Sequence, residues 1–197
     1  MSKDFFNSRA ATWDEKGAEN DTSKLKVIAA RLDIKPGSTV LDVGTGTGVF
    51  IPFLLKKIGR KGKLFCLDFA EEMLKIARAK GFKGNISYVC ADIENNRLDD
   101  KSCDAVVCYS VFPHFQDKLK ALREIYRLLK EDGKIFICHT SSRQAINEIH
   151  QNIPEVCDHL LPENEDIHRM LSDVGFKDIN ISDGKEEYLV SARKTAS

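Results

Sequence analysis

Short apolar runs alternate with amphipathic stretches along almost the whole chain, and this alternation limits the possible folds more than any other feature. The apolar runs lie at residues 36–44, 63–68, 85–92, 103–110 and 134–140. Segments with helical periodicity lie at residues 22–32, 51–58, 70–81, 117–133, 141–151 and 162–176. Strands that are apolar throughout and alternate with helices are typical of a parallel sheet covered on both faces.

The last part of the chain adds a different element. Two further strand-like runs, residues 176–182 and 186–194, flank Asp183-Gly184, a dipeptide that favours a hairpin turn. The sequence therefore predicts an α/β fold with a doubly wound, seven-stranded, mostly parallel sheet and a C-terminal antiparallel hairpin. The length of 197 residues suits one domain. Because no repeat or linker-like tract interrupts the pattern, we expect a single domain over residues 1–197.

Composition narrows the classes of partner. The chain has 30 basic and 30 acidic residues, so its formal net charge is zero and offers no electrostatic footprint for nucleic acid or an acidic membrane. No apolar run has the length of a signal peptide or a membrane span, and we expect a cytoplasmic protein.

The six cysteines form no CxxC pair, which favours buried thiols in a reducing compartment over a thiol cluster for a soft metal or metalloid.

A glycine-rich loop follows the first apolar run. Gly44, Gly46 and Gly48 stand between a strand and a helix, where backbone amides can meet polar or anionic groups. Asp68 ends the second strand, where it can accept hydrogen bonds from both ribose hydroxyls, and Asp92 ends the third. Ligands of open parallel sheets bind at the carboxyl ends of the strands. The sequence therefore predicts a close ligand rather than a simple turn.

The motifs at these strand ends resemble those of the class I S-adenosylmethionine (SAM)-dependent methyltransferases. "VLDVGTGTG" is similar to their first motif, "LDFAEEML" to their acidic ribose motif and "CADIE" to their adenine motif. "CDAVVCYSVFPHF" and "LLKEDGKIFI" are similar to the fourth-strand motif and to the segment leading into the fifth strand. The resemblance covers roughly residues 5–193 and implies a Rossmann-like fold with SAM as the cofactor.

The resemblance also implies roles for individual residues. Gly44, Gly46 and Gly48 would let the backbone approach the methionine part of SAM, and Asp42 would orient the loop or the ligand ammonium. The other implied cofactor contacts are Asp68 at the ribose, Phe69, Asp92 and Ile93 at the adenine, and Cys108 or Tyr109 at the methionyl pocket.

The N-terminal "FFNSRAATWD" resembles the segment that folds over the cofactor in the subgroup that methylates quinones and other small molecules. Residues 1–35 would then be a helical lid segment on a Rossmann-like core of residues 36–197. In that arrangement Phe5, Phe6 and Trp13 would form the lid; packing of these rings against the sheet is the alternative.

Several residues after the fourth and fifth strands are candidates for the methyl acceptor site. "CYSVFPHF" differs from the Asn/Asp-Pro-Pro-aromatic motif of enzymes that methylate exocyclic amines, which argues against nucleic acid. His114 or His139 could act as the general base on an O, S or C nucleophile. Alternatively, His114, His139 and His150, with Glu148 or Asp158, could bind a metal. The candidate substrate contacts are Phe112, His114, Arg143 and His150.

Three functions remain open at this point. The first is methylation of a small-molecule acceptor, and the second is SAM binding without turnover, by a sensor or a partner subunit. A nicotinamide dehydrogenase is disfavoured by the shortened GxGxG spacing and by the final hairpin. Because the core elements use nearly all of the chain, we expect a small substrate, or a pocket completed by a second copy, and a monomer or homodimer.

Overall fold

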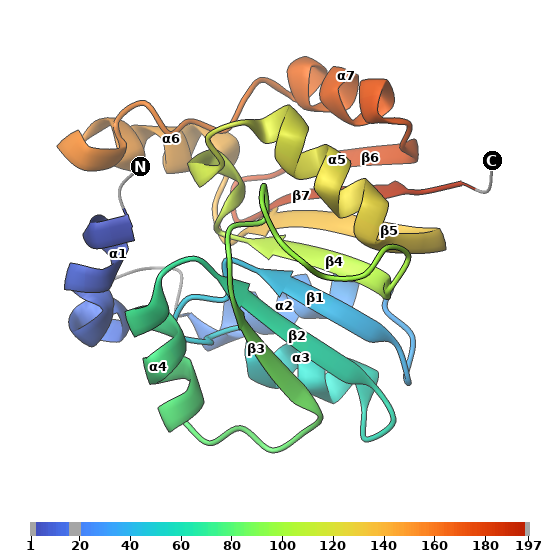
Figure 1. Cartoon of the computed structure of the whole chain (residues 1–197). Coiled ribbons are helices and arrows are strands. Elements are labelled where there is room, and N and C mark those ends of the chain that lie inside the picture. The colour runs from blue at the N-terminus through green and yellow to red at the C-terminus, as the bar shows by residue number, and fades with distance from the viewer. Residues whose placement is uncertain (1–2, 16–20, 196–197) are drawn as a thin grey trace.

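A computed structural model describes residues 3–15 and 21–195 and contains one seven-stranded sheet (Figure 1). The strand order is β3-β2-β1-β4-β5-β7-β6, and β7 runs antiparallel to both of its neighbours. The strands are β1 (Thr39–Val43), β2 (Lys63–Asp68), β3 (Ile86–Cys90), β4 (Cys103–Tyr109), β5 (Leu129–His139), β6 (Lys177–Asp183) and β7 (Tyr188–Arg193). The predicted Rossmann-like sheet with a C-terminal antiparallel hairpin is confirmed.

Helices cover both faces of the sheet. The helices α2 (Thr22–Arg31), α3 (Ile51–Ile58) and α4 (Glu71–Ala79) contribute to the core on one face, and α5 (Lys118–Leu128) and α7 (Asn164–Val174) contribute to the core on the other. The remaining helical elements are α1 (Lys3–Arg9), η1 (Ala10–Glu15), η3 (Phe112–His114), α6 (Arg143–Gln151) and η4 (Pro154–Val156). Figure 1 shows α1 and α6 at the same end of the sheet, where β1 and β4 terminate. This placement leaves the carboxyl ends of the strands between α1 and α6.

The core has two halves because successive residues of a strand point to opposite faces. Val40 packs with α2 and α3 on one face, whereas Leu41 packs with α5 and α7 on the other, and both side chains are fully buried.

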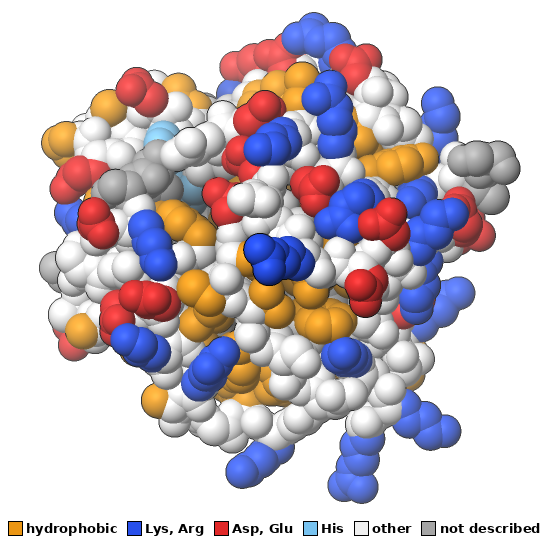
Figure 2. Space-filling model, in the orientation of Figure 1, with side chains coloured by type: hydrophobic (Ala, Val, Ile, Leu, Met, Phe, Trp, Pro, Cys, Tyr) orange, Lys and Arg blue, Asp and Glu red, His pale blue; other side chains and the backbone are white. Residues whose placement is uncertain are grey.

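On the surface, charged side chains of both signs are interspersed over the face seen in Figure 2. Within the described residues, the helices lack the combination of length and apolarity that a bilayer span requires.

The end of α5 differs from the prediction of one helix over residues 117–133. The helix ends at Leu128 and β5 begins at Leu129. Lys194 is 6% exposed, and its ammonium donates hydrogen bonds of 2.8 Å to the carbonyl oxygens of Tyr126 and Leu129. These carbonyls lie at the helix C-terminus, where intrahelical partners run out. A lysine from the far end of the chain therefore satisfies the helix end, which no local pattern reveals.

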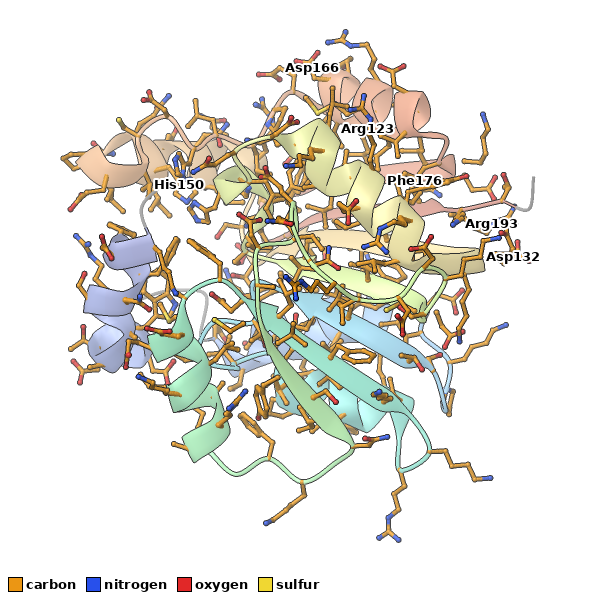
Figure 3. All side chains as sticks on the ribbon, viewed as in Figure 1. Arg123, Asp132, His150, Asp166, Phe176 and Arg193 are labelled. Atoms are coloured by element: carbon orange, nitrogen blue, oxygen red, sulfur yellow. The ribbon has the colours of Figure 1, made fainter. Side chains whose placement is uncertain are left out.

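The start of β5 is held at the edge of the molecule remote from α6. Asp132 has a positive φ of 62°, and its carboxylate accepts a 2.6 Å hydrogen bond from Arg193 of β7. Figure 3 labels both residues at the opposite end of the sheet from His150. The contact ties the turn before the main part of β5 to the neighbouring strand.

The prediction of buried thiols holds for four of the six cysteines. Cys66, Cys103, Cys108 and Cys138 are buried in the sheet, and burial raises the pKa of each thiol above its ordinary value. Cys90 is an exception, because it ends the edge strand β3 and is exposed. Buried thiols with raised pKa values are weak nucleophiles, so the four buried residues serve as small core side chains.

Candidate active site

The glycine loop after β1 uses backbone conformations that favour glycine. Gly44 and Gly46 have φ values of +66° and +56°. A Cβ atom at Gly44 would stand 2.3 Å from Cγ2 of Val111, whereas one at Gly46 would meet little more than the carbonyl oxygen of Gly44 at 3.9 Å. Gly44 is therefore required for packing against the loop after β4, and Gly46 leaves open space beside the backbone for a ligand.

Gly48 packs against the core rather than facing a cavity. Its φ is +87°, and an added Cβ would lie 2.9 Å from Ile51 and 3.0 Å from Phe82. It does not line either of the two cavities described below. Its structural role is close packing of the loop against the core, so its position does not support the predicted contact with the methionine part of the cofactor.

Asp68 links the end of β2 to the glycine loop. One carboxylate oxygen accepts a 2.8 Å hydrogen bond from the N–H of Gly46, and the other accepts one of 2.8 Å from the N–H of Ala70. The residue is 5% exposed, and burial raises its pKa to about 6 against the opposing effect of these hydrogen bonds. Each oxygen retains a second lone pair that can accept from a hydroxyl of a ligand.

Asp42 lies behind the loop rather than in a cavity. Its carboxylate accepts a 2.5 Å hydrogen bond from the hydroxyl of Thr45, and neither cavity includes Asp42. Burial raises its pKa to about 7, with a further contribution from the charge of Asp68. Of the two predicted roles, orienting the loop agrees with this position and binding a ligand ammonium does not.

Two adjoining cavities lie at the carboxyl ends of the strands. The larger has a volume of about 390 Å³ and the smaller about 140 Å³. The residues that line both are Gly44, Asp68, Phe69, Val111 and His114. The predicted adenine contacts Asp92 and Ile93 line the smaller cavity, while Gly46, Tyr109, His139 and His150 line the larger one. Together the cavities form a site of the size usual for small ligands.

The N-terminal segment covers the larger cavity. Phe5, Phe6 and Trp13 all line it, and the ring of Phe6 lies 5.5 Å from that of Phe69 and 5.6 Å from that of His114. Phe6 also packs with Ala70 and Met73 near α4. The three aromatic rings thus occupy the position expected of a lid, whereas residues 1–2 and 16–20 of the predicted lid lie outside the described residues.

Polar contacts hold this segment in place on both sides of the larger cavity. The carboxylate of Asp14 accepts a 2.5 Å hydrogen bond from the hydroxyl of Thr47 in the glycine loop. Arg9 forms a 2.7 Å ion pair with Glu155 of η4 on the other side of the cavity. The cavity is therefore enclosed between the N-terminal segment and the segment that follows α6.

The wall opposite the glycine loop is largely apolar. It is formed by Ile146 and Ile149 of α6 and by Ile153 and Val156 after it. Among the described residues that line the larger cavity, Asp68 is the only carboxylate. This half of the cavity therefore suits an apolar molecule and provides no counter-ion for a cation.

His139 ends β5 and borders the same half of the cavity. It is 2% exposed, and neither ring nitrogen has a hydrogen-bond partner among the described residues. Burial, with a contribution from nearby His150, lowers its pKa to about 3, so the ring is neutral at physiological pH. Buried polar atoms without partners are uncommon in folded proteins, and here they adjoin a cavity.

Three histidines form a cluster beside His139. The rings of His114 and His150 lie 4.9 Å apart, and Nδ1 of His114 is 3.1 Å from Nδ1 of His159. Burial, followed by the charges of His150 and His159, lowers the pKa of His114 well below its ordinary value. Within residues 3–15 and 21–195, no three His, Cys, Asp or Glu side chains are arranged to hold a metal ion. The predicted group of His114, His139 and His150 is thus close together without the geometry of a metal site.

Three predicted site residues, Cys108, Phe112 and Arg143, lie outside both cavities. Cys108 and Phe112 are fully buried in the core and line neither cavity, so Tyr109 alone of the alternative pair reaches the site. Arg143 lines neither cavity and forms a 2.8 Å ion pair with Glu163, as well as a longer one with Asp183. The prediction that Phe112 and Arg143 contact the substrate is not supported by these positions, because one is a core residue and the other is engaged in ion pairs.

Two further residues, His159 and Ser110, lie at or beside the site and are not among the predicted site residues. His159 lies in an irregular segment, and only its position between the predicted helices, near the cavity, could have indicated it. Ser110 follows β4 with a positive φ of 50°, and its buried hydroxyl, which lines the larger cavity, has no hydrogen-bond partner among the described residues. Its place directly after the fourth strand, at the carboxyl end of the sheet, is the signal that could have indicated it.

The residues at this end of the sheet fit SAM. The open space beside Gly46 admits a ligand against the backbone, and Asp68 offers lone pairs to ribose hydroxyls. The hydroxyl of Ser110 has no partner among the described residues and lines the larger cavity, and the predicted adenine contacts Asp92 and Ile93 line the smaller one. When bound, SAM supplies an activated methyl group on a sulfonium.

Comparisons with known proteins agree with this assignment. Residues 41–137 match the profile of a methyltransferase domain family. The ubiquinone/menaquinone biosynthesis C-methyltransferase UbiE of Escherichia coli O1:K1 / APEC is 32% identical over 133 residues, which cover 66% of this chain and 53% of the relative. The chain thus spans about half the length of the curated relatives that it matches.

Solved structures extend the similarity over the whole fold. A SAM-dependent methyltransferase from Aquifex aeolicus is 25% identical, with 98% of each chain covered and a TM-score of 0.74. A methyltransferase of Haloferax volcanii, solved in complex with the Trm112 methyltransferase activator, is 22% identical, with 97% of this chain and 98% of that chain covered and a TM-score of 0.79. With the profile match, the strand-end motifs and the Rossmann-like sheet, these similarities show that the chain has the fold and the SAM cofactor class of the class I SAM-dependent methyltransferases.

Proposed function

We propose that this chain transfers the methyl group of SAM to a small, largely apolar molecule, through an oxygen, sulfur or carbon nucleophile. A histidine of the cavity rim would serve as the base or as a hydrogen-bonding partner of the acceptor. The observation that carries the proposal is His139, whose two ring nitrogens find no partner in the described part of the chain and lie at the wall of an apolar cavity that adjoins the glycine loop. A polar acceptor atom would supply the missing partner.

The chemistry of the wall supports an acceptor without a positive charge. A cationic amine would lose its hydration in this cavity without gaining a carboxylate partner, because Asp68 is committed to the loop and the expected ribose position. A phenol, thiol or activated ring carbon requires no counter-ion. The E. coli relative is a C-methyltransferase by name, so an acidic C–H acceptor belongs in the same group.

The alignment of the acceptor with the methyl group would provide most of the rate enhancement. Reaction at an activated methyl group chiefly needs the nucleophile to be held in line and relieved of its proton. Phe5, Phe6 and Trp13 would exclude water from that alignment, since they cover the larger cavity. The acceptor would lie between them and the isoleucines of α6.

A direct test is to incubate the protein with SAM and with a panel of acceptors, and to follow S-adenosylhomocysteine by mass spectrometry. The panel contains an alkylphenol, a catechol, a hydroquinone, an alkyl thiol and a primary amine of similar size. We expect product with at least one neutral acceptor and none with the amine. Preferential methylation of the amine would contradict the proposed acceptor class.

The same experiment separates turnover from binding alone. A sensor or partner subunit would bind SAM in calorimetry and form no S-adenosylhomocysteine with the panel or with a metabolite extract.

Further, we propose that the active form is a cytoplasmic monomer or homodimer. Sedimentation velocity of the protein with S-adenosylhomocysteine tests the oligomeric state, and a larger assembly would contradict it.

A further inference from the structure

We propose that His150, rather than His114 or His139, takes the proton from the methyl acceptor, with its Nε2 atom as the proton-accepting site. This inference rests on the proposed function and adds the identity of the base. His150 lies on α6 and lines the larger cavity, at the end of the molecule where α1 also lies (Figure 3). Its distinguishing feature is the hydrogen bond that its other ring nitrogen forms.

Nδ1 of His150 is hydrogen-bonded to the backbone carbonyl oxygen of His159. A carbonyl oxygen can only accept, so Nδ1 must carry the proton. In a neutral imidazole the second nitrogen is then unprotonated, and Nε2 holds a free lone pair. Among the described residues, none forms a hydrogen bond with Nε2. Because the two nitrogens flank Cε1 and their outward directions diverge, Nε2 points away from the carbonyl of His159.

The segment that provides this carbonyl is clamped to α6. The N–H of Leu161 donates a 2.8 Å hydrogen bond to Oδ1 of Asn147, and Nδ2 of Asn147 donates one of 3.0 Å to the carbonyl oxygen of Leu161. Asn147 precedes His150 on the same helix, so the clamp holds the carbonyl of His159 against the ring. Asn147 is therefore a positioning residue for the tautomer of His150.

The other two candidates are less suited to accept the proton. Nδ1 of His114 is already hydrogen-bonded to Nδ1 of His159 at 3.1 Å, and its ring packs between His150 and Phe6. No described residue forms a hydrogen bond that would select the tautomer of His139, and its lowered pKa makes it a weak base. His139 is better placed to donate or accept a hydrogen bond that orients the acceptor.

The proton balance of the step follows from this assignment. The acceptor atom gains the methyl group and loses its proton to Nε2 of His150, which becomes an imidazolium. The electron pair of the broken S–CH₃ bond stays on sulfur, so SAM is converted to neutral S-adenosylhomocysteine. The positive charge thereby moves from the sulfonium to His150, where the carbonyl of His159 stabilises it through Nδ1–H.

The tautomer can be measured without any acceptor. In a long-range ¹H–¹⁵N spectrum of histidine-labelled protein with S-adenosylhomocysteine, we expect a protonated Nδ1 and an unprotonated Nε2 for His150. This is the reverse of the tautomer that free histidine prefers in water. The signal is assigned by its loss in His150→Gln, with His168→Gln on the exposed face of α7 as the matched control. A protonated Nε2 in neutral His150 would overturn the proposal.

A second variant tests the positioning role of Asn147. Asn147→Leu removes both clamp hydrogen bonds while keeping a side chain of similar volume. We expect the His150 signal to shift toward a mixture of tautomers in this variant, while the signal of His168 stays unchanged. An unaltered His150 tautomer would show that the clamp has no such role.

Kinetics with two phenols then test proton acceptance itself. A nitrophenol is ionised at mildly alkaline pH, whereas an alkylphenol, with a pKa near that of tyrosine at about 10, is not. We expect His150→Gln to lower kcat about 10²- to 10⁴-fold with the alkylphenol and far less with the nitrophenolate, at unchanged SAM affinity. Equal losses with both phenols would overturn the proposal. Absence of methyl transfer by the unmodified protein would count against the proposed function, whereas the spectrum would still decide the tautomer.

Discussion

The carboxylate of Asp68 accepts a hydrogen bond from the backbone N–H of Gly46 at 2.8 Å, so the end of β2 is joined directly to the middle of the glycine loop. The same carboxylate also accepts from Ala70 at the start of α4. One side chain therefore shapes the loop and faces the cavity at once. A substitution at Asp68 should therefore weaken cofactor binding in two ways, by altering the shape of the glycine loop and by removing a direct contact in the cavity.

Replacing Asp68 with asparagine should weaken cofactor binding with little change of shape. The new amide retains one acceptor but presents a donor to the N–H of Gly46 or Ala70, and a hydrogen bond to a charged group contributes about 1.5–3 kcal/mol. We expect Asp68→Asn to raise the Kd for S-adenosylhomocysteine about 10- to 100-fold, measured by titration calorimetry. Asp173→Asn, on the exposed part of α7, is the control. Unchanged affinity would refute the role of Asp68.

Two glycines of the loop should respond differently to alanine. Both have positive φ, so alanine costs roughly 1–2 kcal/mol at either position. At Gly44 the added Cβ also overlaps the side chain of Val111, at 2.3 Å, whereas at Gly46 it stands in open space. We expect Gly44→Ala to unfold at clearly lower urea concentration than Gly46→Ala. Gly46→Ala should keep most of its stability and lose affinity for S-adenosylhomocysteine, and the reverse order of stability would contradict this account.

Asp42 should make the protein less stable as pH rises through the acidic range. Burial raises its folded-state pKa from 3.8 to about 7, so between these values the folded protein binds more protons than the unfolded chain. The free energy of unfolding then falls with rising pH. In Asp42→Asn this contribution is absent, so its stability relative to wild type should increase from about pH 4 to pH 7 and then level off. Urea titrations of both proteins across this range check the slope, and a flat difference would be the contrary result.

His139 should lower the free energy of unfolding of the protein, although methyl transfer requires it. A leucine at this position fills a similar volume and removes two buried polar atoms that have no hydrogen-bond partner within residues 3–15 and 21–195. We expect His139→Leu to raise the free energy of unfolding by about 1 kcal/mol at neutral pH and to reduce methyl transfer strongly. Thermal melts without ligand and S-adenosylhomocysteine formation measure the two effects. A destabilised variant with full activity would show that His139 is a structural residue.

Much of the fold follows from local patterns in the sequence. Apolar runs such as residues 63–68 and 103–110 are strands because they are buried on both faces, and Asp183-Gly184 joins the final hairpin as its composition predicts. The end of α5 could not be predicted in this way. The helical pattern continues past Leu128, and it is Lys194, far away in the sequence, that binds the last carbonyls.

The sequence by itself determined the sheet, the cofactor loop and the acidic residues at the ends of β2 and β3, because these depend on the order of apolar, glycine and acidic residues along short segments. Only the tertiary structure decided which side chains meet at the acceptor side. Arg143 is held by Glu163, Phe112 turns into the core, and His150 meets the carbonyl of His159. These outcomes depend on how α6 and the segment after it pack against the sheet, and packing between distant segments leaves no periodic signal in the sequence.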